Sequence, residues 1–229
     1  MKRTVAGIEY ELTRKAVKNL NLRLRPDGSV AVSVPRRVPA EEADRFVERN
    51  AVRIRAARER LDRRPGYLNI PDAYRDGDCF WLEGKPYRLC LGCGGPAGPD
   101  GDRLCLPFAE PLSSRDPALT AWLKAWLEPR IQADLELLKP RLAAFCSRQP
   151  GPVRLRLTLS RWGSCNARTG ELHFSVRLAH LPPEAVRAVV AHELAHLAVP
   201  NHSRAFYQAV ERILPDYSRR QALLRPPAN

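Results

Sequence analysis

The chain has 229 residues, 44% of them hydrophobic and 28% charged, with a formal net charge of +13. This composition is typical of a globular protein with a buried core, and it excludes a low-complexity chain. No apolar run approaches a membrane span and no apolar segment of the secretory kind follows Met1, so we expect a soluble, cytoplasmic protein whose six cysteines are reduced.

The positive charge is unevenly distributed. Residues 1–70 carry 17 Lys and Arg against 9 Asp and Glu, whereas residues 71–149 are nearly neutral and residues 150–229 carry 11 against 5. A basic face attracts nucleic acid, nucleotides or acidic substrates. The arginines are scattered and lack the aromatic interleaving of single-strand binders, so no motif supports a nucleic-acid partner.

The first third of the chain predicts a hairpin followed by a helix. Leucine alternates with polar residues over 20–24, valine alternates over 30–34, and Pro26-Asp27-Gly28 supplies a turn between them. Pro39 then opens an amphipathic helix with an arginine-rich outer face, which Pro65-Gly66 ends. Residues 4–34 are therefore predicted as β structure with one buried face.

Short strands are predicted around Cys79–Leu82, Tyr87–Leu91 and Arg103–Leu106, as a small β layer that continues from the N-terminal hairpin. We therefore expect an N-terminal β-rich region with one helix over residues 1–110 and a catalytic domain over residues 111–229.

Four cysteines lie in this middle section, at Cys79, Cys90, Cys93 and Cys105. The spacing of Cys90 and Cys93 is that of a metal or redox motif, but the other two cysteines are single and no helix start follows the motif. Strand and loop thiols are favoured over a second, structural metal site, and the role of the four stays open.

An amphipathic helix is predicted from Asp116 to Cys146, kinked or divided at Pro129 and Pro140. Its tryptophans are expected in the core. Two strands follow, one with leucine and valine alternating over residues 153–159 and one at about residues 172–178.

The metal-binding pattern lies on the next predicted helix, which begins at Pro182-Pro183-Glu184 and runs to about Val199, before Pro200. His192 and His196 are four residues apart, so both imidazoles lie on one helix face and can reach the same ion. His202 follows as a third ligand. Glu193 is placed to act on a metal-bound water.

Three histidines with an open fourth position are typical of a catalytic zinc site, whereas structural sites are closed by four protein ligands. Zinc lowers the pKa of its water, and Glu193 would take that proton and pass it to the leaving group of an amide or ester. A structural site has no use for this glutamate. A surface helix with incidental histidines is the alternative, and the apolar residues flanking the motif argue against it.

Further candidates surround this helix. Arg161-Trp162-Gly163-Ser164-Cys165 is placed close to the ion if the second strand borders the cleft; the alternative is that Trp162 fills core space and Gly163 serves the turn. Residues 171–178 are our candidate for an edge strand that pairs with extended substrate. His173 could face the cleft as an electrophile, His180 is expected at the surface or in a turn, and Tyr217 could donate to a developing oxyanion.

The chain resembles the YgjP-like (DUF45) metallopeptidase family, which is distantly similar to the SprT and WLM zinc proteases. The resemblance rests on Arg161–Cys165, His192–Leu197, Asn201-His202-Ser203 with Phe206, Pro215-Asp216-Tyr217 and the N-terminal hairpin. It implies a zincin-like core with His192, His196 and His202 as ligands and Glu193 as base. Ser175 stands where the family usually has asparagine.

We therefore predict an α+β protein with a zincin-like catalytic core, a zinc metallopeptidase that acts on a peptide or protein substrate and has no membrane partner. One alternative is a metal-dependent nucleotide phosphohydrolase, in which the arginines bind the phosphates. Another is a nucleic-acid-associated protease or binding module, whose affinity would fall steeply with salt.

Overall fold

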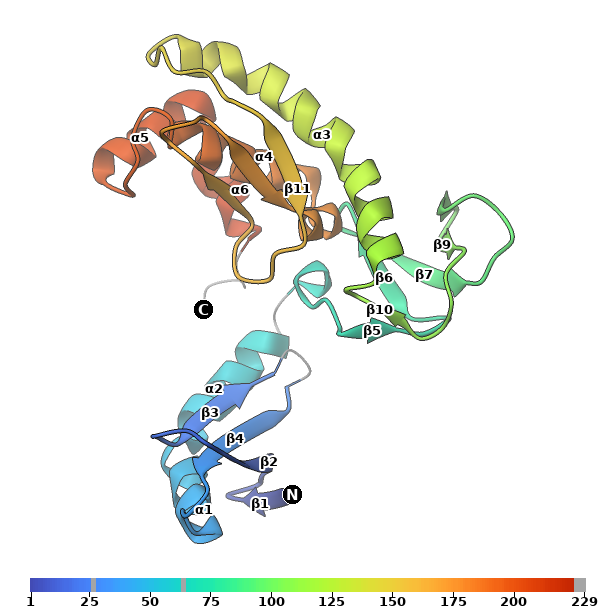
Figure 1. The fold of residues 1–229 in the computed structure, drawn as a ribbon, viewed down its shortest axis with the longest axis vertical. Coiled ribbons are helices and arrows are strands. Elements are labelled where there is room, and N and C mark those ends of the chain that lie inside the picture. The colour runs from blue at the N-terminus through green and yellow to red at the C-terminus, as the bar shows by residue number, and fades with distance from the viewer. Residues whose placement is uncertain (26–27, 63–64, 225–229) are drawn as a thin grey trace. The chain divides into compact units, whose positions relative to one another are not determined.

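The computed structural model describes residues 1–25, 28–62 and 65–224, which form two compact units, Met1–Pro65 and Gly66–Arg225. Figure 1 shows both helices and β-strands in each unit, which confirms the predicted α+β class. The units divide at Gly66 and not at residue 110, because the strands between residues 79 and 106 bury their apolar side chains in the core of the second unit.

The first unit contains a sheet of strand order β1-β2-β4-β3. Its strands are Lys2–Val5 (β1), Ile8–Lys15 (β2), Asn21–Leu24 (β3) and Val30–Pro35 (β4). The pair β3–β4 is antiparallel, which confirms the predicted hairpin, while Pro26 and Asp27 of its turn lie outside the described residues. The pair β1–β2 is antiparallel and the pair β2–β4 is parallel.

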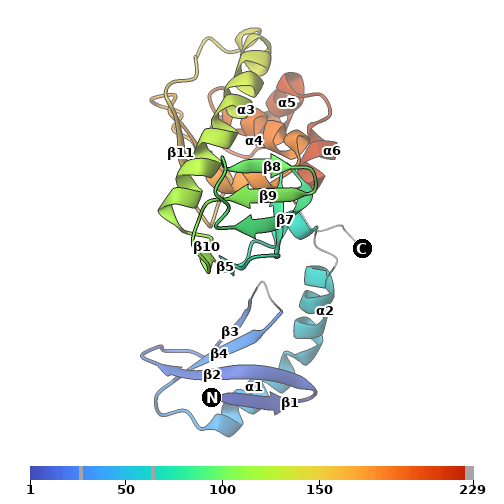
Figure 2. The same cartoon turned by 90° about the vertical axis from the view of Figure 1, so that its right-hand side faces the viewer.

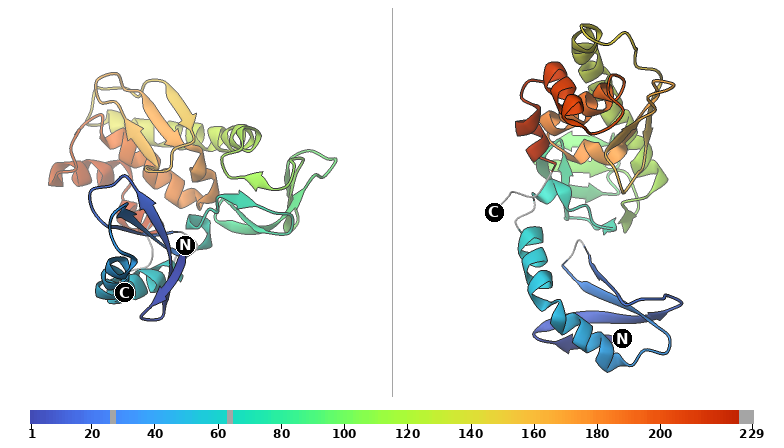
Figure 3. Two further views of the ribbon diagram at one scale, coloured as in Figure 1. Left: turned by 60° about the horizontal axis from the view of Figure 1, so that its bottom comes forward. Right: turned by 90° about the vertical axis from the view of Figure 1, so that its left-hand side faces the viewer.

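The single helix predicted after Pro39 is divided into α1 (Ala40–Arg49) and α2 (Ala51–Asp62). Asn50 lies at the break, where its side-chain Nδ2 donates to the carbonyl of Phe46 at 2.8 Å. An asparagine that bonds to nearby backbone competes with helical hydrogen bonding, which accounts for the break. Figure 3 shows both helices along one face of the sheet. The helix residues that pack there are Ala43, Val47, Ala51 and Ile54.

The second unit begins with a short 3₁₀ helix, η1 (Gly66–Leu68), and a sheet of strand order β6-β7-β9-β8. Its strands are Cys79–Leu82 (β6), Lys85–Leu91 (β7), Gly98–Asp100 (β8) and Arg103–Leu106 (β9). A two-stranded ladder pairs β5 (Ala73–Tyr74) with β10 (Leu112–Ser113). The three predicted strands are confirmed, but they form a sheet of their own and do not extend the N-terminal one (Figure 2).

Helix α3 (Pro117–Ala143) is one uninterrupted helix, so neither Pro129 nor Pro140 divides it. Both prolines are exposed, and water can therefore satisfy the carbonyls that they leave without a helical donor. Asp116 caps its start by accepting from the backbone amides of Ala118 at 2.8 Å and Leu119 at 3.3 Å. A stripe of apolar residues at helical spacing faces the core, formed by Leu119, Leu123, Leu127, Ile131, Leu135, Leu138 and Leu142.

The third sheet has the strand order β11-β13-β12. Its strands are Val153–Arg156 (β11), Gly163–Cys165 (β12) and Leu172–Ser175 (β13). Both predicted strands are shorter than expected, since β11 ends at Arg156 and residues Val176–His180 form the 3₁₀ helix η2. Ser175 ends β13 because its Oγ accepts from the backbone amide of Arg177 at 3.3 Å.

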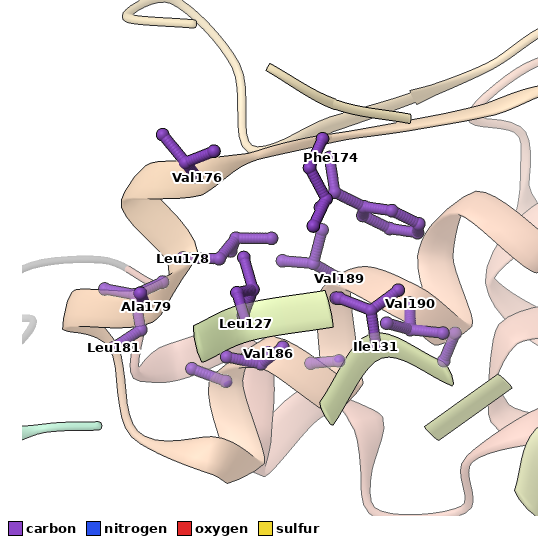
Figure 4. Close-up of a cluster of buried hydrophobic side chains, with 14 of the residues drawn as sticks. Leu127, Ile131, Phe174, Val176, Leu178, Ala179, Leu181, Val186, Val189 and Val190 are labelled. Atoms are coloured by element: carbon purple, nitrogen blue, oxygen red, sulfur yellow. The ribbon is translucent and has the colours of Figure 1, made fainter. Parts of the chain in front are cut away.

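Three helices complete the unit: α4 (Pro183–Ala195), α5 (Arg204–Ile213) and α6 (Tyr217–Ala222). Figure 4 shows Val186, Val189 and Val190 of α4 in one buried cluster with residues of α3, β13 and η2. Each fully buried side chain of this size contributes about 1.5–3 kcal/mol, so the cluster holds α4 firmly in place. Among the described residues, no helix combines the length and apolar character that a membrane span requires.

Candidate metal centre

Helix α4 carries two of the three predicted metal ligands at its C-terminal end. His192 lies in the last turn, and the helix ends at Ala195, four residues before the predicted end at Val199. His196 is the capping residue, and the amides of Leu197 and Val199 then bond back to Leu194 and Ala195. Because the chain turns here, it returns toward His192 within a few residues.

The three imidazoles converge as predicted. Nε2 of His192 lies 3.0 Å from Nε2 of His202, and one ring nitrogen from each of His192, His196 and His202 lies within 4.8 Å of the others. Among the described residues, this is the one such group of three or more His, Cys, Asp or Glu. Three imidazole nitrogens that meet at one point form a donor set for a divalent transition metal, so the residues fit a metal ion.

Phe206 of α5 supports all three rings. Its ring centroid lies 4.8 Å from that of His192, 4.5 Å from that of His196 and 4.9 Å from that of His202. From the sequence, Phe206 entered only as one of the residues of the family resemblance, with no role of its own. Its position four residues after His202, on the buried face of α5, is the pattern that brings it under the three imidazoles.

The Nδ1 atoms of the two helix histidines have partners behind the centre. Nδ1 of His196 donates to the carbonyl of Val199 at 3.3 Å, which leaves Nε2 of that ring with a free lone pair. Nδ1 of His192 lies 2.9 Å from Oη of Tyr217, and Nε2 of Gln221 donates to the same Oη at 2.7 Å. The Tyr217 hydroxyl therefore contacts His192, whereas we had expected it to serve an oxyanion.

Burial keeps these histidines neutral at physiological pH. It lowers the pKa of His192 to about 4, with smaller contributions from the neighbouring His196 and His202, and it also lowers the pKa of His196. Neutral imidazole is the form that binds a metal. The electrostatics of the centre therefore favour metal binding over protonation.

Glu193 lies beside this cluster with 4% of its surface exposed. Burial raises the pKa of its carboxyl to about 8, which the positive charge of Arg161 partly opposes. Gly163 of β12 lies directly against this side chain, since a Cβ at residue 163 would lie 2.6–2.9 Å from Oε1, Cγ and Cδ of Glu193. Only glycine fits there. The sequence suggested Gly163 as a turn residue. In the structure it lies in strand β12, where the absence of a side chain leaves space for Glu193.

A cavity of about 290 Å³ opens over His192 and Glu193. Its walls come from Trp162 and Gly163 on one side and from helices α4 and α6 on the other, and they include Val189 and Tyr217. Trp162 therefore lines the cleft and is only partly buried, which favours a place beside the metal centre over the alternative that it only fills the core. Cys165 lies nearby, and burial, with a smaller effect of Glu193, raises the pKa of its thiol to about 11.

The predicted edge strand at residues 171–178 is wrong. Strand β13 lies between β11 and β12, so its backbone groups are paired on both sides. Strand β12 is the edge on the side of Glu193. The order of strands depends on pairing between segments far apart in sequence, which alternation within one segment does not reveal.

The two remaining histidines lie away from the metal centre. His180 is buried, contrary to its expected place at the surface, and its Nδ1 lies 2.6 Å from the carbonyl of Trp81. Burial lowers its pKa to about 4. His173 lies on the outer face of the third sheet, with Nε2 3.6 Å from Oε1 of Glu171, and so does not face the cleft above Glu193.

All six cysteines have free thiols. Cys90 and Cys105 are directly paired across β7 and β9, and the Sγ of Cys93 donates to the carbonyl of Cys90 at 3.3 Å. Cys79 lies on the neighbouring strand β6 and is exposed. These residues occupy strand and turn positions, as the sequence predicted.

Similarity to known proteins supports a family assignment. A family model described as "YgjP-like, metallopeptidase domain" matches residues 18–226. Among solved structures, the metallopeptidase zymogen abylysin of Pyrococcus abyssi is 23% identical; the match covers 41% of this chain and 90% of abylysin, with a TM-score of 0.36. No curated protein matches the chain. The resemblance seen in the sequence is confirmed, and the chain belongs to the YgjP-like metallopeptidase-domain family.

Proposed function

We propose that the protein is a zinc-dependent peptidase in which His192, His196 and His202 bind the metal and Glu193 is the general base. The observation that carries this proposal is the convergence of three imidazoles beside a buried carboxyl on the same helix. Membership of a metallopeptidase-domain family supports peptide-bond hydrolysis and a peptide or protein substrate. When bound by three imidazoles, zinc keeps a position open and supplies Lewis-acid polarisation of a carbonyl.

In the proposed reaction, Glu193 transfers the proton of the attacking water. Its carboxyl lies in the wall of the cavity that also exposes His192, so it can accept a proton from an attacking water molecule there and donate it to the leaving amine. Burial raises its pKa to about 8, so the carboxyl holds a proton readily once it has accepted one. A carboxyl with both forms accessible suits a group that first accepts and then donates a proton.

Strand β12 positions the substrate. Its free edge borders Glu193, and an extended peptide that pairs with this edge would carry its scissile carbonyl past the metal centre. The cavity beside Trp162 and Val189 would then take one side chain of the peptide.

Two substitutions test the metal and the base separately. We expect His192→Ala or His202→Ala to lower bound zinc from one equivalent to well below one, measured by elemental analysis of the purified protein. Glu193→Gln is expected to keep zinc and to abolish cleavage of casein and of a peptide library. His173→Ala is the matched control for zinc content, since this histidine lies outside the cluster.

Full peptidase activity of Glu193→Gln would remove Glu193 as the base. Release of phosphate or pyrophosphate from a nucleotide panel, with no cleavage of any peptide, would replace the peptidase with a metal-dependent nucleotide phosphohydrolase. A proteomic comparison of cells that contain the wild-type protein with cells that contain Glu193→Gln would then identify the physiological substrates.

A further inference from the structure

A second cavity, of about 300 Å³, lies on the face of the β11-β13-β12 sheet that points away from the core. Residues alternate across this sheet: Leu172 and Phe174 are buried, whereas His173 and its register partner Ser164 point to the other face. Arg156, at the end of β11, lies on that outer face as the register partner of Ser175. Thr158, Ser160 and Arg161, from the loop after β11, also line the cavity.

The loop over this cavity is anchored to the sheet. Oγ of Ser175 donates to the carbonyl of Thr158 at 2.9 Å, the amide of Ser175 donates to the carbonyl of Trp162 at 2.8 Å, and Nη1 of Arg177 donates to the carbonyl of Leu159 at 3.2 Å. Oγ1 of Thr158 also donates to the carbonyl of Arg161 at 3.0 Å. These bonds fix the loop to the sheet beside the cavity.

The cavity is positively charged. Arg156 and Arg161 both line it, and neither forms an ion pair with a carboxylate among the described residues. Glu171, on the same face, pairs with Arg154 and lies 3.6 Å from His173, and the charge of Arg156 also helps to lower its pKa. The charge of Arg161 acts on Glu193 on the side of the metal centre. Hydroxyl groups of Ser160 and Ser164 add hydrogen-bond donors, whereas the hydroxyl of Thr158 already donates to Arg161. Two arginines with hydroxyl donors form a suitable site for a carboxylate.

This cavity lies next to the metal centre, because Gly163 lines both cavities. A peptide added to the edge of β12 would present successive side chains to opposite faces of the sheet. Side chains on one face would meet the cleft above His192 and Glu193. Side chains on the other face would meet the cavity lined by Arg156 and Arg161.

We propose that the cavity formed by Arg156, Arg161 and the Thr158–Arg161 loop binds a carboxylate of the peptide substrate, so that the protein selects peptides with an acidic side chain next to the scissile bond. This inference rests on the proposed peptidase function and names its substrate class. A free C-terminal carboxylate would satisfy the same chemistry, and the experiment separates it from an acidic side chain.

The test uses the full-length, zinc-loaded protein and a library of peptides with amidated C-termini, with cleavage sites read by mass spectrometry. We expect Asp and Glu to be enriched at one position near the cleaved bond. A matched pair of peptides with Glu or Gln at that position should differ about tenfold in kcat/KM, as expected for one charge-assisted hydrogen bond.

The double variant Arg156→Gln, Arg161→Gln should lose this discrimination while it keeps its zinc content and circular dichroism spectrum. The control is Arg88→Gln, Arg103→Gln, which removes two exposed arginines paired across β7 and β9 and should keep the preference. Loss of preference in both double variants would show a general charge effect and overturn the proposal. Acidic preference that survives in the Arg156, Arg161 variant would also overturn it.

A second measurement does not depend on turnover. The same Glu and Gln peptides, labelled with a fluorophore, are titrated against zinc-loaded Glu193→Gln protein, and anisotropy should show tighter binding of the Glu peptide. If no peptide is cleaved by the wild type but the Glu peptide still binds more tightly, the peptidase function fails and the carboxylate site stands. Equal binding of both peptides, or preference only for peptides with a free C-terminus, would overturn the acidic side-chain site.

Discussion

Nδ1 of His192 lies 2.9 Å from the hydroxyl oxygen of Tyr217, while Nε2 of the same ring faces His202. One ring nitrogen therefore has a hydroxyl partner, and the other faces the histidine cluster, where it can bind a metal. A fixed Nδ1–H makes the imidazole a better and more precisely oriented ligand.

Tyr217→Phe should therefore weaken zinc binding about tenfold to a hundredfold, because Nδ1 of His192 loses its partner while the ring of residue 217 stays in place. Competition with a chromophoric chelator measures the change. Tyr207→Phe is the control, since Tyr207 is 40% exposed on α5 and does not contact His192. Equal zinc affinity of Tyr217→Phe and the wild type would show that the hydroxyl has no part in metal binding.

Gly163→Ala should lower peptidase activity about a hundredfold or more while zinc stays bound. The added methyl group would lie 2.6 Å from Oε1 of Glu193, so the carboxyl or strand β12 has to move, and a displacement of about 1 Å is enough for a loss of that size. Gly94→Ala is a matched control, because a Cβ there meets no atom within 4 Å. Normal kcat in Gly163→Ala would contradict the tight packing of Glu193 against β12.

His180 should make the protein sensitive to mild acid. Its pKa is about 4 in the folded state and about 6.5 when unfolded, so between these values the unfolded state binds more protons and stability falls as pH falls. The resulting loss of unfolding free energy reaches roughly 3 kcal/mol below about pH 4 and disappears well above about pH 6.5. Urea unfolding at pH 7 and pH 5 of the wild type and of His180→Gln should show a smaller loss in the variant. An equal loss in both proteins would assign the acid sensitivity to other groups.

The pair Asp134–Arg187 should stabilise the contact between α3 and α4. Nε of Arg187 donates to Oδ1 of Asp134 at 2.7 Å, and Asp134 is 1% exposed, so its burial raises the pKa of that carboxyl while Arg187 opposes the shift. Asp134→Ala leaves the guanidinium without its partner and should lower the free energy of unfolding by about 2–3 kcal/mol.

The exposed pair Glu136–Lys139 on the same helix provides the comparison. Glu136→Ala should change the free energy of unfolding by less than about 1 kcal/mol, as is usual for surface ion pairs. Denaturant melts of both variants measure the difference. Similar values for Asp134→Ala and Glu136→Ala would contradict a structural role for the buried pair.

The local parts of the site were predictable from sequence. Spacing of four residues places His192 and His196 on one helix face, and the short segment after them brings His202 within reach. Alternation of apolar and polar residues likewise predicts the strands around residues 79–106, and the capping residue Asp116 predicts the start of α3. Each of these patterns depends on residues close together in the chain.

The parts that were missed depend on contacts between distant segments. His180 is buried because the carbonyl of Trp81, 99 residues earlier, meets its Nδ1. The order β11-β13-β12 makes residues 172–175 central, and Gly163 is needed because it lies against Glu193, thirty residues later. Periodicity in a single segment contains no information on such pairings.

The early end of α4 has a consequence for how the protein matures. All three imidazoles lie within the eleven residues from His192 to His202, so a cation that binds them closes only a small ring of backbone. The loss of chain entropy on such a short closure is small, and contacts of low sequence separation form early in folding. The histidine cluster can therefore form from local contacts before the distant sheets assemble, and a cation bound there would add no long-range closure cost.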